Sequence, residues 1–254
     1  MRNLALGMCL LLTAAVARAE TPGNCSITSG RSDGKLMLSW DSGECSQGRH
    51  CHDGGSGMPW SRWSGITPRD LEREGATIDA RMKAEAGELR CVGTVHDGAL
   101  RGTYSFTQDE TFVAQMKTMG FDGLTHDRLQ GYAMLDVTTE WVKELKDLHV
   151  TEMNSDNLMG LRALGVDGAY IRGMNAAGYP ELDAPKLTGM KAVGVSPEKV
   201  QAVRAMGFSP TKEELIQMSV FKIDAPFVER MKARGFKNLT ISQLVQIKVF
   251  KLDE

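Results

Sequence analysis

The chain of 254 residues lacks several features that would point to common functions. It has no block of basic residues of the kind that neutralises phosphates, so we expect no nucleic-acid partner. Its one long apolar run lies at the N-terminus, so we expect no transmembrane anchor once that run is removed. His-Glu-x-x-His, a glycine-rich phosphate loop and Gly-x-Ser-x-Gly are all missing. The sequence therefore gives no support for an enzyme or for a cofactor.

The N-terminal apolar run is typical of a secretory signal. Arg2 provides a positive start, residues 4–16 form the apolar core, and residues 17–19 read Ala-Arg-Ala, a small-x-small cleavage site. We predict that residues 1–19 are a signal peptide and that the mature protein begins near Glu20. This predicts a periplasmic or secreted location.

Cysteines are few, and residues 92–254 contain none. The four that would remain after cleavage all lie in the N-terminal third: Cys25, Cys45, Cys51 and Cys91. An even number in an oxidising compartment predicts two disulfides, for which three pairings are possible. The second half of the chain must then be stabilised by packing alone.

Residues 20–108 show the period-two apolar pattern of β-strands. Residues 100–106 alternate in this way, and so do residues 89–95, with His96-Asp97-Gly98 between them as a tight hairpin. Two further strand candidates are residues 35–40 and 76–82. A small antiparallel β domain, stapled by the disulfides, is the simplest interpretation. Residues 42–65 are rich in glycine and are predicted to form a long loop.

A repeat organises residues 109–254. Helix-capping residue types recur at steps of 29, 29, 29 and 28 residues: Asp109, Thr138, Asp167, Ser196 and Asp224. Second capping positions follow within each unit: Thr125, Asn154, Asp183, Thr211 and Thr240. Each unit thus encodes two helices of about ten residues, which are too short to persist alone in water. We predict five tandem helix-pair repeats in an α-solenoid-like array, and an α+β fold for the whole chain.

Equivalent positions of the units share their chemistry. The residue before the cap is apolar in the last four units, where it can form a hydrophobic staple: Val137, Val166, Val195 and Ile223. The first helix ends at a glycine in four units, and at His149 in the second, which would need a left-handed conformation there. An aromatic column, Phe112, Trp141, Tyr170 and Phe227, could bind a ligand, but burial is the favoured interpretation.

Two clusters in the glycine-rich loop are candidates for function. Trp60 and Trp63, around Arg62, could be exposed recognition residues, with packing onto the sheet as the alternative. His50, His52 and Asp53 could hold a metal ion together with the nearby cysteines. Their spacing matches no paired ligand motif, and export favours the cysteines as disulfides.

The units resemble a known repeat. The pattern Phe-Val-x-x-Met-Lys-x-x-Gly-Phe-x-x-Leu-Thr of residues 227–240 is similar to the repeats in the exported C-terminal regions of bacterial sensor metallopeptidases of the beta-lactam-receptor family, and in related stand-alone exported proteins. The likeness covers residues 109–254, and residues 102–107 resemble the strand that leads into such repeats. The zinc motif and membrane helices of the peptidases are missing, so protease activity is not implied. The resemblance implies a bacterial interaction or sensing module of the cell envelope.

Three functions are therefore compared with the structure. The first is an exported non-enzymatic protein that binds another protein or an envelope component through its repeats or the Trp60/Trp63 loop. The second is a metal-binding protein or metal-dependent enzyme centred on His50, His52 and Asp53. The third is a regulator or inhibitor of an envelope enzyme.

Overall fold

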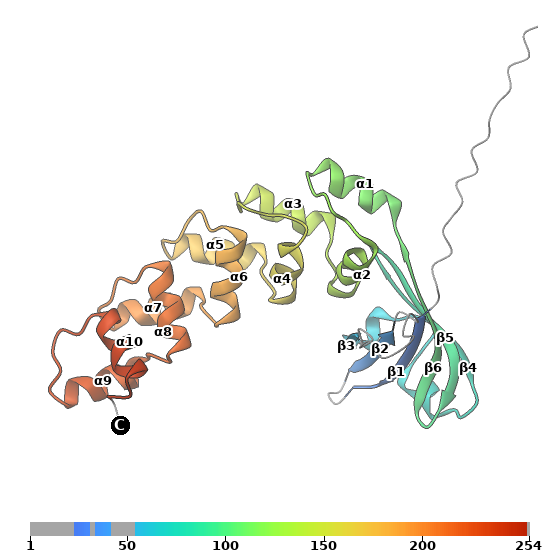
Figure 1. Ribbon diagram of the computed structural model, residues 1–254, viewed down its shortest axis with the longest axis horizontal. Helices are drawn as coiled ribbons and strands as arrows, with labels where there is room; N and C mark the ends of the chain where they lie inside the picture. The colour runs from blue at the N-terminus through green and yellow to red at the C-terminus, as the bar shows by residue number, and fades with distance from the viewer. Residues whose placement is uncertain (1–22, 31–33, 42–53, 253–254) are drawn as a thin grey trace, which may run out of the picture.

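The computed structural model describes residues 23–30, 34–41 and 54–252. The N-terminal part of the described chain forms an antiparallel sheet, and ten α-helices follow it in sequence (Figure 1). The predicted α+β class is confirmed. The sheet ends at Gln108, and Asp109 caps the first helix.

Six strands form one curled antiparallel sheet, a half-barrel, in the order β3-β2-β1-β6-β5-β4. Beyond β3 the chain turns back to the opposite edge of the sheet. There the Ser64 N–H donates to the Arg81 carbonyl of β4 (2.8 Å), and the Ser64 carbonyl accepts from the Arg81 N–H (2.9 Å), which partly closes the curl. The strands are β1 (Gly23–Ser29), β2 (Lys35–Asp41), β3 (Gly54–Pro59), β4 (Thr77–Ala84), β5 (Gly87–His96) and β6 (Ala99–Gln108).

The hairpin and all four predicted strand regions are confirmed, but part of the predicted loop is not a loop. Asp97 and Gly98 both have positive φ, as a two-residue β-turn requires. Residues 54–62 form β3 and a short 3-10 helix, η1 (Trp60–Arg62). Gly54 is needed there because a Cβ would lie 2.1 Å from the Trp40 ring of the neighbouring strand. The glycines of β3 thus reflect close packing against the neighbouring strand and not only a turn.

One disulfide joins Cys25 of β1 to Cys91 of β5, and both residues are buried. It spans β6, which lies between these two strands, and so ties the middle of the sheet together. A cross-link over 66 residues stabilises a fold by about 4 kcal/mol if it acts mainly on the unfolded chain. Cys45 and Cys51 lie outside the described residues, so the second disulfide stays a prediction.

The predicted helix pairs are present in all five units. The first helices are α1 (Glu110–Thr118), α3 (Thr139–Asp147), α5 (Gly168–Ala176), α7 (Pro197–Ala205) and α9 (Ala225–Ala233). The second helices are α2 (His126–Leu135), α4 (Asn157–Ala163), α6 (Ala184–Ala192), α8 (Lys212–Val220) and α10 (Ile241–Val249). Every predicted cap of a first helix accepts a hydrogen bond from the backbone three residues later.

Two local details differ from regular helix pairs. The helix predicted to begin at Asn154 begins later, because the Asn154 side chain instead accepts from the backbone N–H groups of Asp156 and Asn157, both at 3.0 Å, and holds a turn ahead of α4. His149 adopts the left-handed conformation expected of it, with φ 59°.

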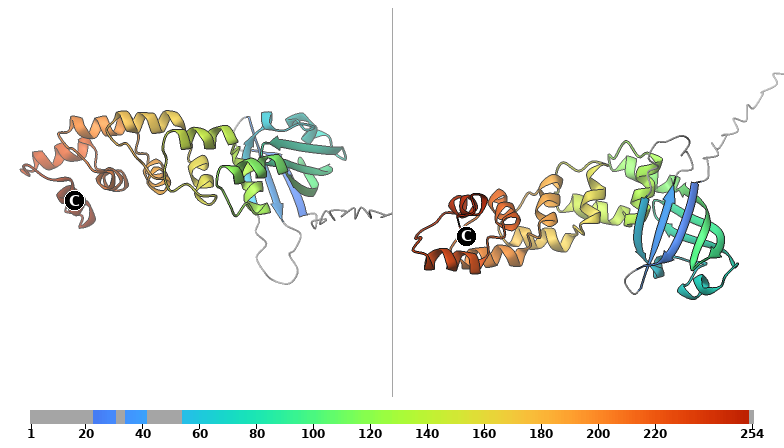
Figure 2. Two further views of the ribbon diagram at one scale, coloured as in Figure 1. Left: turned by 90° about the horizontal axis from the view of Figure 1, so that it is seen from above. Right: turned by 60° about the horizontal axis from the view of Figure 1, so that its bottom comes forward.

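Helices of the same position in successive units pack on one another. In the second-helix row α2, α4, α6, α8 and α10 are consecutive neighbours, and in the first-helix row α1 packs on α3 and α5 on α7. Figures 1 and 2 show the helices in a curved row that leads away from the sheet. At the sheet end α2 lies against β4, β5 and β6, so the sheet and the helices share one hydrophobic core.

Aromatic side chains join consecutive units. The Trp141 indole N–H donates to the Val166 carbonyl (2.9 Å), and the Tyr170 hydroxyl donates to the equivalent Val195 carbonyl (3.0 Å). The Tyr132 hydroxyl reaches the Ser155 carbonyl of the next unit (2.7 Å). The aromatic column is buried, as expected, and each of its polar groups satisfies a backbone carbonyl.

A cation of the second helix covers the aromatic ring of the first helix in three units. Arg162 lies 5.3 Å from the Trp141 ring centre, Lys191 4.2 Å from Tyr170, and Lys248 4.3 Å from Phe227. The fourth unit has Lys199 and Ser219 at these two positions, so it lacks both partners of the pair. Its two helices are joined without this contact.

The buried tyrosines predict an alkaline limit to stability. Burial raises the pKa of Tyr170 to about 12 and also raises the pKa of Tyr132. Unfolded tyrosine ionises near pH 10, so the stability that these hydroxyls contribute is fully present below pH 10 and is lost as pH rises through 12. Each raised pKa adds a slope of up to about 1.4 kcal/mol per pH unit.

Urea unfolding at pH 8, 10 and 11 measures this effect. The Tyr132→Phe, Tyr170→Phe double variant should be less stable at pH 8, because two buried carbonyls lose their donors, but its stability should fall less between pH 10 and pH 11 than that of the wild type. An equal fall in both proteins would contradict the assignment of the pH dependence to these two groups.

Candidate functional site

The tryptophans predicted to be exposed recognition residues lie at the junction of sheet and helices. Trp63 has only 7% of its surface exposed and belongs to the hydrophobic core, so the alternative of packing onto the sheet holds for this residue. Trp60 is half-buried against the same core. The Trp63 indole N–H has no hydrogen-bond partner among the described residues.

Arg62 connects the sheet to the first helical unit. Its guanidinium donates to the carbonyls of Met134 (2.6 Å) and Ala133 (2.7 Å) at the end of α2, and lies 3.6 Å from the Asp136 carboxylate. Burial lowers the pKa of Arg62, and the nearby Asp136 opposes that effect. Because its donors already serve helix carbonyls, Arg62 has a structural role at this junction.

The predicted metal ligands His50, His52 and Asp53 lie outside the described residues. Across residues 23–30, 34–41 and 54–252, no group of three or more His, Cys, Asp or Glu side chains could hold a metal ion. Two other histidines have structural neighbours: His96 contacts Glu74 (2.8 Å), and His126 packs edge-on against Phe106. The metal hypothesis therefore stays a prediction.

The C-terminal end of the array is the surface that stands out. Of the six large apolar side chains that are well exposed within the described part of the chain, five lie between residues 220 and 252. Phe250 is 68% exposed, Leu252 59%, Val249 50% and Phe236 41%. These four residues are named the C-terminal tip. Exposed apolar groups gathered in this way commonly mark a binding surface.

The repeat explains why the tip is exposed. Leu252 occupies the staple position, and its equivalents Val137, Val166, Val195 and Ile223 are at most 2% exposed. Phe236 is equivalent to Phe121 and Tyr179, which are 3% and 7% exposed. In the inner units the following unit covers these positions, whereas no further helix pair among the described residues packs on the tip. The alignment of Leu252 with the staple valines is a signal that the sequence already contains.

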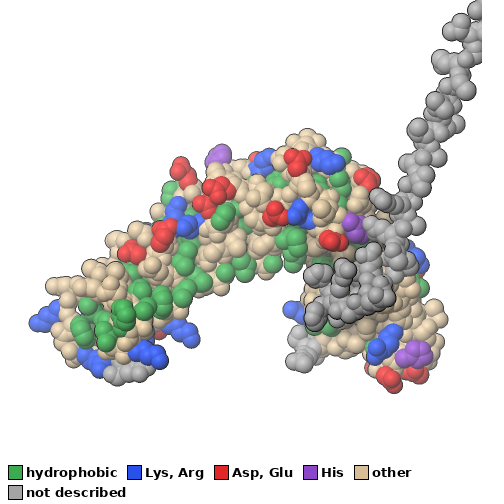
Figure 3. All heavy atoms as spheres, viewed as in Figure 1, with side chains coloured by type: hydrophobic (Ala, Val, Ile, Leu, Met, Phe, Trp, Pro, Cys, Tyr) green, Lys and Arg blue, Asp and Glu red, His purple; other side chains and the backbone are tan. Residues whose placement is uncertain are grey.

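The charge of the array changes sign along its length. Residues 109–166 contain ten Asp or Glu and five Lys or Arg, whereas residues 224–254 contain four and six. Figure 3 shows basic side chains at the outer end of the array and along its lower edge, next to a hydrophobic patch. Within the described region, Lys237 and Lys251 form no ion pair. Asp253 and Glu254 follow in the sequence and lie outside that region.

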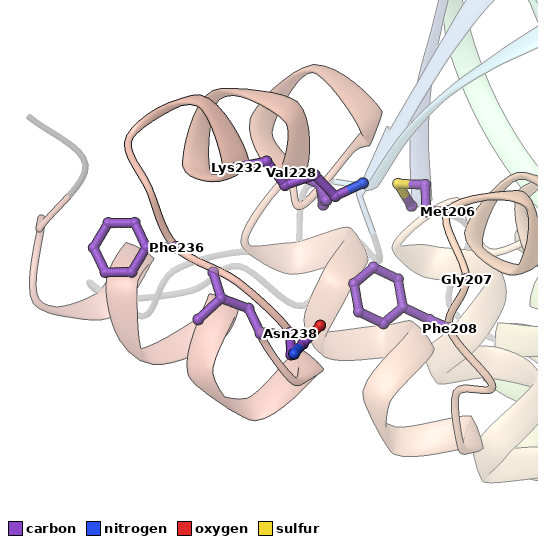
Figure 4. Close-up of a pocket in the computed structure, with 8 residues that line it drawn as sticks. Met206, Gly207, Phe208, Val228, Lys232, Phe236 and Asn238 are labelled. Atoms are coloured by element: carbon purple, nitrogen blue, oxygen red, sulfur yellow. The ribbon is translucent and has the colours of Figure 1, made fainter.

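A cavity of about 230 Å³ separates the fourth and fifth units next to the tip (Figure 4). Met206 and Phe208 line it on one side, and Val228, Lys232 and Phe236 on the other. At the preceding junction Tyr179 is buried and its hydroxyl donates to the Pro210 carbonyl (2.5 Å). Phe208, in the unit that is one residue shorter, has no hydroxyl and stays half-buried, which leaves the space open.

A second depression, shallow and open to solvent, lies between α1 and α3. This α1–α3 groove has a volume of about 530 Å³ and is lined mainly by methyl and methylene groups of Thr111, Ala114, Thr118, Met119 and Thr139. Glu140 and Lys143 border it. The Glu85 carboxylate accepts hydrogen bonds from the backbone and hydroxyl of Thr139 (2.8 and 2.9 Å), which fixes α3 to the β4–β5 turn.

The chain matches no known protein family, no curated protein and no solved structure. None of the described helices is both long and apolar enough to span a membrane. The candidate site therefore depends on the geometry of the chain itself.

The role of Arg62 predicts a large loss on truncation. Arg62→Ala should lower the free energy of unfolding by about 2 kcal/mol, because two helix carbonyls lose a charged donor. Arg62→Lys, which keeps one charge but not the fork, should lose less. Arg73→Ala is the matched control, since its pair with Asp70 is exposed and should change stability by less than about 0.5 kcal/mol. Denaturant unfolding would contradict this role if Arg62→Ala and Arg73→Ala were alike.

Proposed function

We propose that the protein is an exported, non-enzymatic interaction protein of the periplasm or the extracellular space, and that its helical array binds another protein or an envelope component. The array is proposed to be an α-solenoid, in which each helix pair stacks on the next around one elongated core. The packing of first helices on first helices and of second helices on second helices supports that arrangement.

One observation carries the proposal: the exposed apolar surface is concentrated at the C-terminal tip. A solvent-facing Phe250 and Leu252, next to an open cavity and among lysines, are arranged as the centre and rim of a binding surface. The resemblance of the units to exported sensor-associated repeats supports the same class of function. We place the surface at the tip and not at Trp60, Arg62 and Trp63, because Arg62 and Trp63 are used inside the fold.

Substitution of the tip tests the proposal. Phe250→Ser, Leu252→Ser should abolish capture of a partner from an envelope extract by the full chain, while leaving its circular dichroism and thermal unfolding unchanged, because both side chains are exposed. Met37→Ser is the matched control, since Met37 is the one well-exposed large apolar residue of the described chain outside residues 220–252. The proposal fails if the double variant captures the same proteins as the wild type.

A further inference from the structure

We infer that the C-terminal tip of one chain docks in the α1–α3 groove of a second copy, so that chains associate head to tail. This inference rests on the proposed function, because it takes the tip as the binding surface and names its partner.

The tip provides the apolar group that needs cover. Leu252 stands at a position that a following helix pair buries in every inner unit. Phe236 stands at a position that is buried in every inner unit except the fourth, where Phe208 is half-buried. Phe250 adds the most exposed large apolar side chain of the described residues. In the inner units a helix of the next unit packs on these positions. An exposed helical surface of another copy could therefore pack on the tip in the same way.

The α1–α3 groove provides a complementary surface on the same chain. On the α1 side it is lined by the exposed, small side chains of Thr111, Ala114 and Thr118, which leave room for apolar side chains of a partner to pack between the two helices. The equivalent space between α3 and α5 is crossed by the ion pair of Glu144 with Arg172 (3.1 Å). At α1 and α3 the same positions hold Gln115 and Lys143, and no such pair closes the groove.

Charge decides between the two ways in which copies could meet. Two tips would bring together two surfaces of small net positive charge, each with six basic and four acidic residues, which disfavours that contact. A tip that approaches the first two units meets a surface with twice as many acidic as basic residues. The groove itself has one carboxylate, Glu140, and one ammonium group, Lys143, so the attraction comes from the wider surface of these units and is screened by salt.

A contact between two different surfaces of one chain does not close on itself unless the rotation happens to form a ring. Each bound copy still offers a free tip at one end and a free groove at the other. The inference therefore predicts open chains of copies that grow with concentration, and not a dimer of fixed size.

Sedimentation velocity of the full chain over a range of concentrations tests this. The wild type should show a mean mass that rises continuously with concentration, and less so at 500 mM than at 50 mM salt. Phe250→Ser, Leu252→Ser should weaken association about a hundredfold or more. Ala114→Arg, which places a cation in the groove, should do the same, whereas Ala192→Arg on the exposed face of α6 and Met37→Ser should not.

Mixing the two impaired variants is the decisive step. The tip variant keeps an intact groove and the groove variant keeps an intact tip, so an equimolar mixture should form one junction and stop at a dimer. A wild type that stays monomeric at about 100 μM, or a mixture that stays monomeric, would overturn the inference. If the wild type is monomeric and the tip variant still loses capture of an envelope partner, only the head-to-tail pairing is wrong and the proposed function stands.

Discussion

The structure depends on the stacking of helices that are too short to be stable alone. Nine residues form barely two and a half turns, and an isolated helix of that length is unstable in water. The stabilising contacts therefore run between units: staple valines, indole and hydroxyl bonds to the next unit, and helices packed on their equivalents. Such an array has two ends that need cover. The sheet covers the first through α2 and Arg62, whereas the C-terminal end has no such cover among the described residues.

The fourth unit changes the character of the array just before that end. Lys199 and Ser219 replace the aromatic and the cation that join the helices of the second, third and fifth units. The same unit has the shorter connection, and Phe208 leaves the cavity that Tyr179 fills one unit earlier. The unit without the aromatic–cation contact and the cavity between the fourth and fifth units therefore adjoin the exposed tip.

The repeat half was predictable from the sequence because capping and staple residues act locally. The caps at Asp109, Thr138, Asp167, Ser196 and Asp224 are all found, and so is the left-handed His149. The half-barrel was less predictable. β1 has only two alternating apolar residues, Cys25 and Ile27. β3 is rich in glycine because it packs against Trp40 of β2, a contact that its own sequence does not reveal. The role of Arg62 depends on contacts with α2 some seventy residues away, which no local pattern encodes.

Amide hydrogen exchange of the dilute, monomeric chain tests most directly whether the array is anchored at the sheet and open at its C-terminal end. Protection should be greatest in α2, which packs on three strands, and should decrease unit by unit to α10. A drop in protection at α7 and α8 would correspond to the missing cation and aromatic pair. If α9 and α10 were instead as protected as α2, the C-terminal end would be as stable as the rest, and the account of an uncovered tip would be wrong.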